Sequence, residues 1–235
     1  MLPVDPPDAA TRFRTAWAAR PGTDYLFRQP VLNVVLVVLT CGIFGWYLFY
    51  QLVRRSRDHN RRRLDLLDAA TTVAWEAAHG AGLGEALRPE FERIAVHLQT
   101  LRNRTTEFRD PAIWLLILVV AGTVGQIVAF VLLDQDLVVH DAAELAIETD
   151  LATIYARLGA PVPRPDPTRV KGNDDYVARI VVSVLTCGVY TLWWWVDQQR
   201  DGDRHCTTNW SWEDALAVAV AQVGGTPRPA LPPTS

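Results

Sequence analysis

Three long apolar blocks, separated by charged segments, constrain this chain more than any other feature. Pro30 to Tyr50 and residues 111–133 contain no charged side chain, and residues 176–196 contain only Arg179. Each block has about 20 residues or more, enough for a helix to cross a hydrocarbon core of roughly 30 Å. The mean hydropathy of +0.06 resembles that of a soluble protein because charged segments offset the blocks. We predict an all-α integral membrane protein with transmembrane helices at 30–53, 111–133 and 176–196.

Flanking charge predicts the orientation of these spans. An arginine-rich stretch follows the first block, whereas the second is followed by acidic residues, Asp134 to Asp150, with no arginine or lysine among them. Arginine resists translocation, so we expect the 54–110 loop in the cytoplasm, the N-terminus outside and the C-terminus inside. An alternative is that the blocks containing Gly42 and Gly45, or Gly188, are re-entrant; the block lengths favour full spans.

The remaining segments divide by composition and periodicity. An N-terminal segment, 1–29, lacks the apolar core of a signal peptide. Apolar spacing predicts amphipathic juxtamembrane helices after each span and a cytoplasmic helical hairpin, 64–79 with 85–104. The predicted organisation beyond the spans is a basic segment with this hairpin (54–110), an acidic helix with a Pro-rich linker (134–175), a juxtamembrane helix (197–223) and a disordered tail (224–235).

An internal repeat links the outer units. The sequence LTCGIF at 39–44 recurs as LTCGVY at 185–190, an offset of 146 residues that also aligns His59 with His205. A fainter middle copy pairs residues 27–30 with 108–111 and His59 with His140. The repeat therefore predicts that each unit is a span followed by a helix.

The repeated segment resembles a family of prokaryotic membrane proteins of unknown function. Residues 40–47 and 186–193 are similar to its T-x-G-I-Y-x-x-Y-W signature at the end of a span, although Phe44 replaces the tyrosine in the first copy and the second block lacks the motif. The resemblance implies a multi-pass protein of the prokaryotic cell membrane. The family has no established catalytic residues, so it implies none here.

Three sets of residues are candidate interaction sites. Small residues let helices approach closely, so we expect spans one and three to pack through Thr40, Gly42, Thr186 and Gly188. The apolar face of 85–104 predicts a partner-binding surface at Leu87, Phe91, Ile94, Leu98 and Leu101. The basic run can bind anionic lipid headgroups through Arg54, Arg55, Arg57, Arg61, Arg62 and Arg63, besides setting the topology.

Catalytic, cofactor and metal sites are not predicted. The familiar nucleotide, hydrolase and metalloprotease motifs are absent from the sequence, and a net charge of -3 gives no reason to expect nucleic acid. Three histidines at equivalent repeat positions suggest a zinc site: His59, His140 and His205. The predicted topology, however, places His140 across the membrane from the other two. We interpret them as polar anchors at span ends.

The leading hypothesis is a non-enzymatic membrane scaffold that binds lipids and a protein partner or its own copies. The alternative is a small transporter, channel or lipid-moving protein assembled as an oligomer, with a polar path lined by Asn33, Gln126 or Ser183. An enzyme at the membrane interface would require a cavity with convergent titratable groups.

Overall fold

The computed structural model describes residues 8–106 and 110–225, and these residues form helices and loops with no strand. The predicted tail falls almost wholly on 226–235, outside the described residues. The helices are α1 (Ala9–Ala18), α2 (Arg20–Thr23), α3 (Pro30–Leu39), α4 (Ile43–Gly80), α5 (Arg88–Thr106), α6 (Pro111–Arg157), the 3-10 helix η1 (Pro167–Arg169), α7 (Tyr176–Leu185) and α8 (Val189–Val223).

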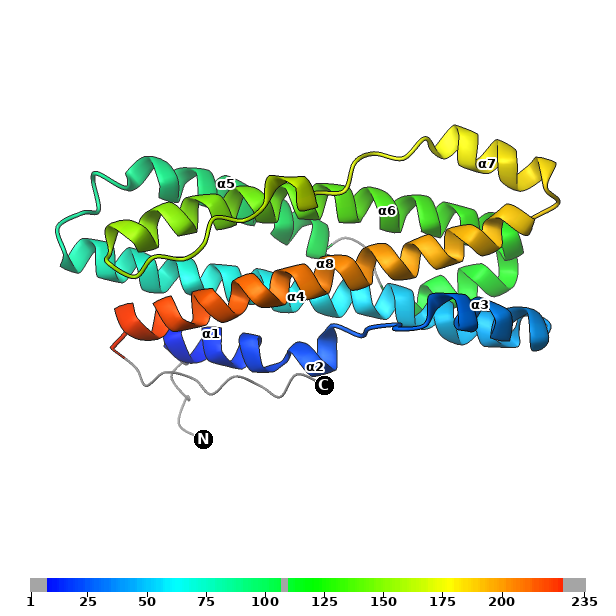
Figure 1. The fold of residues 1–235 in the computed structure, drawn as a ribbon, viewed down its shortest axis with the longest axis horizontal. Coiled ribbons are helices and arrows are strands. Elements are labelled where there is room, and N and C mark those ends of the chain that lie inside the picture. Colours follow the sequence, from blue (N-terminus) through cyan, green and yellow to red (C-terminus); the bar gives the residue numbers. More distant parts are fainter. Residues whose placement is uncertain (1–7, 107–109, 226–235) are drawn as a thin grey trace.

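Helices α4, α6 and α8 run along the length of an elongated bundle, and the shorter helices pack on them (Figure 1). Helix α1 packs against α4 and α8, while α5 packs against α4 and α6. Their apolar faces form one continuous core that includes Phe13, Leu66, Leu67, Ile94, Leu101, Ile147, Leu151 and Leu216. Burial of these faces holds the five helices together.

The first apolar block is a helical hairpin. Helix α3 ends at Leu39, and the chain turns back through Cys41 and Gly42, whose φ angles of 49° and 91° are left-handed. The Gly42 amide donates to the Val37 carbonyl at 2.8 Å, which closes the turn as a C-terminal helix cap. A Cβ on Gly45 would lie 3.4 Å from Val37 Cγ1, so the start of α4 returns alongside α3.

The third block repeats this geometry. Cys187 and Gly188 have φ angles of 49° and 88°, and the Gly188 amide donates to Ser183 at 2.8 Å. Helix α8 then returns along α7, which brings Arg179 to 3.5 Å from Asp197. A straight helix would separate those two residues by about 27 Å.

The second block reverses inside α6. Gly122 has φ 53° and ψ -133°, which is not helical. A Cβ on Gly125 would lie 3.0 Å from the carbonyl oxygen of Ile117, so the chain doubles back there as well. Gly122 occupies the position that the predicted repeat aligns with Cys41 and Cys187.

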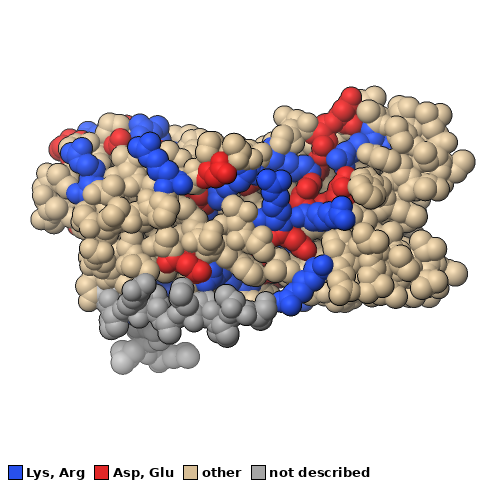
Figure 2. Space-filling view, in the orientation of Figure 1, with Lys and Arg blue, Asp and Glu red and all other residues tan. Residues whose placement is uncertain are grey.

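The three hairpins gather at one end of the molecule, the right-hand end of Figure 1. Phe49, Phe130, Trp194 and Trp195 form part of a second, smaller core between them. Figure 2 shows that this end is almost bare of charged residues on the face in view, whereas charges gather over the middle and the opposite end. On this face, charged and uncharged surface are thus separated along the long axis.

Only α6, among the described residues, is both long and apolar enough to qualify as a membrane-spanning helix. Helices α3 and α7 have 10 residues each, which is about 15 Å and half of the hydrocarbon thickness. The predicted straight spans at 30–53 and 176–196 are therefore wrong in detail, because each is two antiparallel helices. The predicted span 111–133 is broken at Gly122.

The helices predicted after the first and second spans are direct continuations of those hairpins. Residues 64–79 are the second half of α4, and residues 134–157 the second half of α6. Helix α5 pairs with the end of α4 after a short turn, as the periodicity predicts.

Candidate functional site

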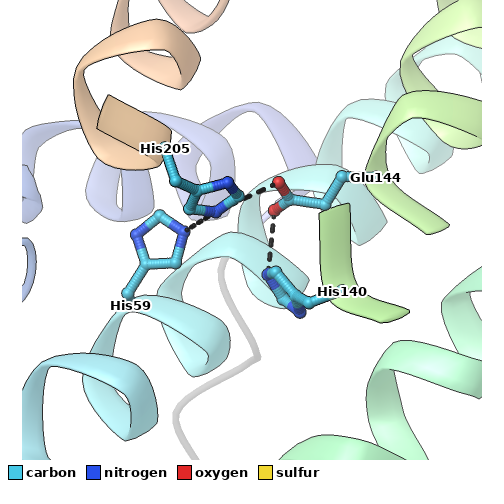
Figure 3. Close-up of side chains that lie close together, drawn as sticks. All are labelled: His59, His140, Glu144 and His205. Carbon is cyan, nitrogen blue, oxygen red and sulfur yellow. Dashed lines mark hydrogen bonds and ion pairs between the residues drawn. The ribbon is translucent and has the colours of Figure 1, made fainter. Parts of the chain in front are cut away.

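A group of buried histidines lies in the polar middle of the bundle, beyond the apolar hairpins. Helix α4 supplies His59, α6 supplies His140 and Glu144, and α8 supplies His205 (Figure 3). All four side chains are at most 8% exposed. Since the hairpins all reverse in the same direction, the three histidines at equivalent positions of the predicted repeat meet at one place.

His59 and His205 face each other through like atoms. Their Nε2 atoms are 3.0 Å apart. On the far side of each ring, His59 Nδ1 lies 3.0 Å from Asp24 and His205 Nδ1 lies 2.8 Å from Asp141. An ionised carboxylate only accepts hydrogen bonds, so each Nδ1 carries a proton. In neutral rings, the two facing Nε2 atoms then present lone pairs to each other.

His140 and Glu144 complete the group from a single face of α6, one turn apart. His140 Nε2 lies 3.1 Å from Glu144 Oε1, and Glu144 Oε2 lies 3.6 Å from His205 Nε2. The other ring nitrogen of His140, Nδ1, makes no hydrogen bond to any described residue, although the side chain is buried. A buried polar group without a partner costs free energy and calls for an explanation.

An outer layer of polar groups fixes the orientation of the histidines. Asp24 also accepts from Arg62 Nη2 at 2.7 Å and from Trp210 Nε1 at 2.7 Å. Burial acts to raise the pKa of Asp24, but His59 and Arg62 outweigh it and hold that pKa well below its usual range. Asn209 donates to Glu144 Oε2 at 2.8 Å and lies 3.2 Å from His205 Nε2.

The environment acts in opposite directions on the two facing histidines. Burial lowers the pKa of His59, with Asp24 opposing it. Burial acts the same way on His205, but its hydrogen bond to Asp141 and the charge of Glu144 raise its pKa. Two arrangements remove the repulsion between the facing Nε2 lone pairs of His59 and His205. In one, a ring is protonated and donates a hydrogen bond to the other; in the second, both lone pairs bind a cation.

A neighbouring group, Asp24 with His59 and Cys206, also has metal-ligand types close together. The Cys206 Sγ lies 3.6 Å from His59 Nδ1, the atom already engaged by Asp24. Burial raises the pKa of the Cys206 thiol, which keeps it protonated and a weak ligand. A small cavity of about 50 Å³ adjoins the histidines and is lined in part by His59, His205 and Cys206.

Half of the predicted lipid-binding run is buried in ion pairs, which corrects that prediction. Arg62 pairs with Asp24 and Glu213. Arg63, fully buried, pairs with Glu144, Glu148 and Glu213. Arg55 lies 2.6 Å from Asp203 and its guanidinium covers the ring of Phe27. The other predicted members are more accessible: Arg54 and Arg61 are exposed and Arg57 is half-buried.

The predicted partner surface on α5 is also corrected. Leu87, Phe91, Ile94, Leu98 and Leu101 are all buried, and they pack into the main core against α4 and α6. The periodicity identified an apolar face correctly, but the chain itself covers that face. The amphipathic pattern alone does not distinguish an internal partner from an external one.

The predicted packing residues lie in the hairpin turns instead of at a crossing of two spans. The Thr40 hydroxyl donates to Leu36 and accepts from the Phe44 amide, which joins α3 to α4. Thr186 makes the equivalent bonds. Gly42 and Gly188 both line a cavity of about 330 Å³ between the hairpin tips, with Gln126 in its wall.

The histidine centre had a signal in the sequence. The equivalent positions of the three histidines, and the four-residue spacing of His140 and Glu144 on one helix, both point to it. The assumption of three alternating spans hid it, because that topology separates His140 from the others. Asp24 and Asp141 had no comparable signal, since they approach from segments far apart in the chain.

No family model, no curated protein and no solved structure matches this chain.

Proposed function

We propose that this protein is a non-enzymatic membrane module that inserts three helical hairpins into the bilayer from one side and presents its charged helical body to a protein partner or to another copy. The observation that carries this proposal is the exposure of large apolar side chains on the hairpins. They include Val31, Leu32, Leu39, Ile43, Leu116, Val120, Val124, Val177, Val184, Leu185 and Val189. Exposed apolar surface of this extent marks a membrane or protein interaction site.

The turn chemistry supports immersion of the hairpin tips. Backbone polar groups in hydrocarbon need partners within the protein. In the first hairpin, the amides of Thr40, Cys41 and Gly42 all donate to carbonyls of α3, and the Thr40 hydroxyl accepts from Phe44. The third hairpin satisfies its turn in the same way. Such turns carry few unsatisfied groups into lipid.

Aromatic residues and charges support an interface farther along the hairpins. Trp46, Tyr47 and Trp193 are exposed on the returning helices, and amphipathic rings favour the headgroup level. Charged residues begin just beyond them, at Arg54, Asp134 and Asp197. The predicted repeat would then place three equivalent hairpins at one depth.

The internal pairing of the polar core supports a non-enzymatic role. Arg62, Arg63 and Asp24 each have several buried partners. These side chains pair with one another across different helices. Their primary role in this proposal is therefore to join the helices.

Cysteine accessibility tests the one-sided insertion. Cysteines at Ala81, Arg164 and Gly172 replace exposed loop residues, with Cys41, Cys187 and Cys206 changed to Ser or Ala. We expect a membrane-impermeant maleimide to label all three positions from the same side of sealed vesicles. Labelling of Ala81 and Arg164 positions from opposite sides would restore the three-span topology and refute the proposal.

A second candidate, a small transporter or lipid-moving protein, rests on the cavity between the hairpin tips. Gln126 lines that cavity, and its Nε2 has no hydrogen-bond partner among the described residues. Asn33 donates to Gln199 and Ser183 to Arg179, so these two are engaged internally. This candidate predicts that Gln126→Leu abolishes passage of a polar solute or lipid in reconstituted vesicles; unchanged passage would reject it.

A further inference from the structure

We propose that His59, His140, His205 and Glu144 bind one zinc ion, which joins α4, α6 and α8 at equivalent points of the three hairpin units. The site would be closed, with four protein ligands, as in structural zinc centres. This inference does not depend on the proposed membrane function, because metal binding by the purified protein is measured separately from insertion.

The ligand atoms lie close to the spacing that zinc requires. One ligand atom from each residue lies within 4.8 Å of all the others. Ligands bound to tetrahedral zinc at about 2.0–2.1 Å are roughly 3.4 Å apart. The separations of 3.0 Å between the His59 and His205 Nε2 atoms, 3.1 Å from His140 Nε2 to Glu144 Oε1 and 3.6 Å from Glu144 Oε2 to His205 Nε2 lie on either side of that value.

His140 supplies an independent reason for a cation. Its imidazole is 1% exposed, its Nδ1 has no hydrogen-bond partner among the described residues, and its Nε2 meets the Glu144 carboxylate at 3.1 Å. Its Nε2 points toward Glu144 in the group (Figure 3). A metal bound at Nε2 would be shared with the adjacent Glu144 carboxylate, so the ring and the carboxylate would serve as two of its ligands.

The outer layer of two of the three histidines, His59 and His205, matches that of metal-binding histidines. Such histidines usually donate their second ring N–H to a carboxylate, which fixes the tautomer and directs the other nitrogen at the metal. Asp24 does this for His59 and Asp141 for His205. Asn209 in turn donates to Glu144 and orients its carboxylate.

The donor set favours zinc among common divalent ions. Three imidazoles exclude a preference for Mg²⁺ or Ca²⁺, which select oxygen ligands. A compact group of three nitrogens and one oxygen suits the tetrahedral geometry of Zn²⁺. Co²⁺ adopts the same geometry and is visible by absorption, so it serves as a spectroscopic probe of the site.

Metal content of the full-length protein tests the proposal. The chain is purified in mild detergent without a polyhistidine tag, stripped with a chelator, dialysed, and titrated with Zn²⁺ and with Co²⁺. We expect one equivalent of zinc by elemental analysis, the intense visible absorption of tetrahedral Co²⁺, and a melting temperature several degrees higher with zinc than without it. Mg²⁺ at the same concentration should not change the melting temperature.

Paired variants identify the ligands. His140→Gln should lose zinc binding and the Co²⁺ absorption while keeping its helical circular dichroism, whereas His97→Gln, on the half-buried part of α5, should bind one equivalent. If His140→Gln does not fold, the wild-type titration still decides the matter. Less than a tenth of an equivalent of zinc and an unchanged melting temperature in wild type would overturn the proposal and favour a shared proton between His59 and His205. Equal binding by His140→Gln and wild type would overturn the ligand assignment.

Discussion

At the scale of the residue, Asp24 holds together segments far apart in the chain. It lies just after α2, yet it accepts hydrogen bonds from His59 and Arg62 of α4 and from Trp210 of α8. Its side chain is fully buried, so these donors take the place of water. Removal of one member of a buried charged group leaves the others unpaired, which costs more than the original pair contributes.

Asp24→Asn should therefore lower the free energy of unfolding by about 3–5 kcal/mol. The amide keeps the shape of the side chain but loses its charge beside Arg62. Denaturant unfolding in detergent measures the change. Asp8→Asn is the matched control, because Asp8 is exposed and caps α1, a position where Asn is equally suitable. A loss below 1 kcal/mol for Asp24→Asn would show that this carboxylate is not the junction described.

Residue-level prediction from sequence had a clear limit here. The alignment of His59, His140 and His205 was visible, but their meeting depended on the path of the chain between them. The arginines at 62 and 63 appeared as a juxtamembrane charge run because their partners Glu144, Glu148 and Glu213 lie on other helices. Sequence distance conceals such pairs, and only packing reveals them.

At the scale of the element, the left-handed turns decide whether each apolar block is a span or a hairpin. Block length did not settle this, since about 20 residues fit either one crossing or two short helices. The Thr-Cys-Gly sequence was the informative signal: glycine tolerates the φ of 91° at Gly42, and threonine caps both helices from the turn. The helices at 64–79 and 85–104 were predictable because their periodicity is strong.

Gly42→Ala and Gly188→Ala should each destabilise the protein by about 1–2 kcal/mol, because L-residues pay that cost in the left-handed region. A Cβ at either position meets no atom within 4 Å, so the effect isolates backbone strain. Gly80→Ala, at a helical position that is equally open, should be neutral or stabilising. Thermal unfolding compares the three, and equal effects at Gly42 and Gly80 would contradict the turn geometry.

The buried face of α5 gives a second prediction at this scale. Leu101→Ala should lower stability by about 2–5 kcal/mol, as expected when a large side chain is removed from a packed core. Val96→Ala, on the exposed face of α5, should change stability by less than about 0.5 kcal/mol. If Leu101→Ala leaves stability intact and abolishes binding of a partner instead, the original surface prediction was right.

At the scale of the whole molecule, the polar and apolar ends have separate roles in this account. The hairpins provide the apolar end, while the charged bundle carries both the histidine centre and the connecting loops. Near-average composition hides this division, because the apolar blocks and the charged segments cancel in the mean hydropathy of +0.06.

A charge at a hairpin tip should weaken membrane association without unfolding the bundle. Leu39 and Leu185 are 72% and 76% exposed at the tips. Arginine at the bilayer centre costs about 2.5–3.5 kcal/mol on insertion scales. The double variant Leu39→Arg with Leu185→Arg should therefore appear more in the soluble fraction after an alkaline wash. Val96→Arg, an exposed site on α5, should stay in the membrane fraction to the same extent as wild type.

The reversal of the first apolar block is the central claim, since the three histidines meet only if the blocks fold back. Spin labels at Gln29→Cys and Arg54→Cys, with the native cysteines replaced, measure it by pulsed electron paramagnetic resonance in lipid. A straight helix from 29 to 54 separates the labels by about 38 Å. The hairpin, which holds Arg55 4.7 Å from the Phe27 ring, predicts less than half of that distance. A distance near 38 Å would contradict the account.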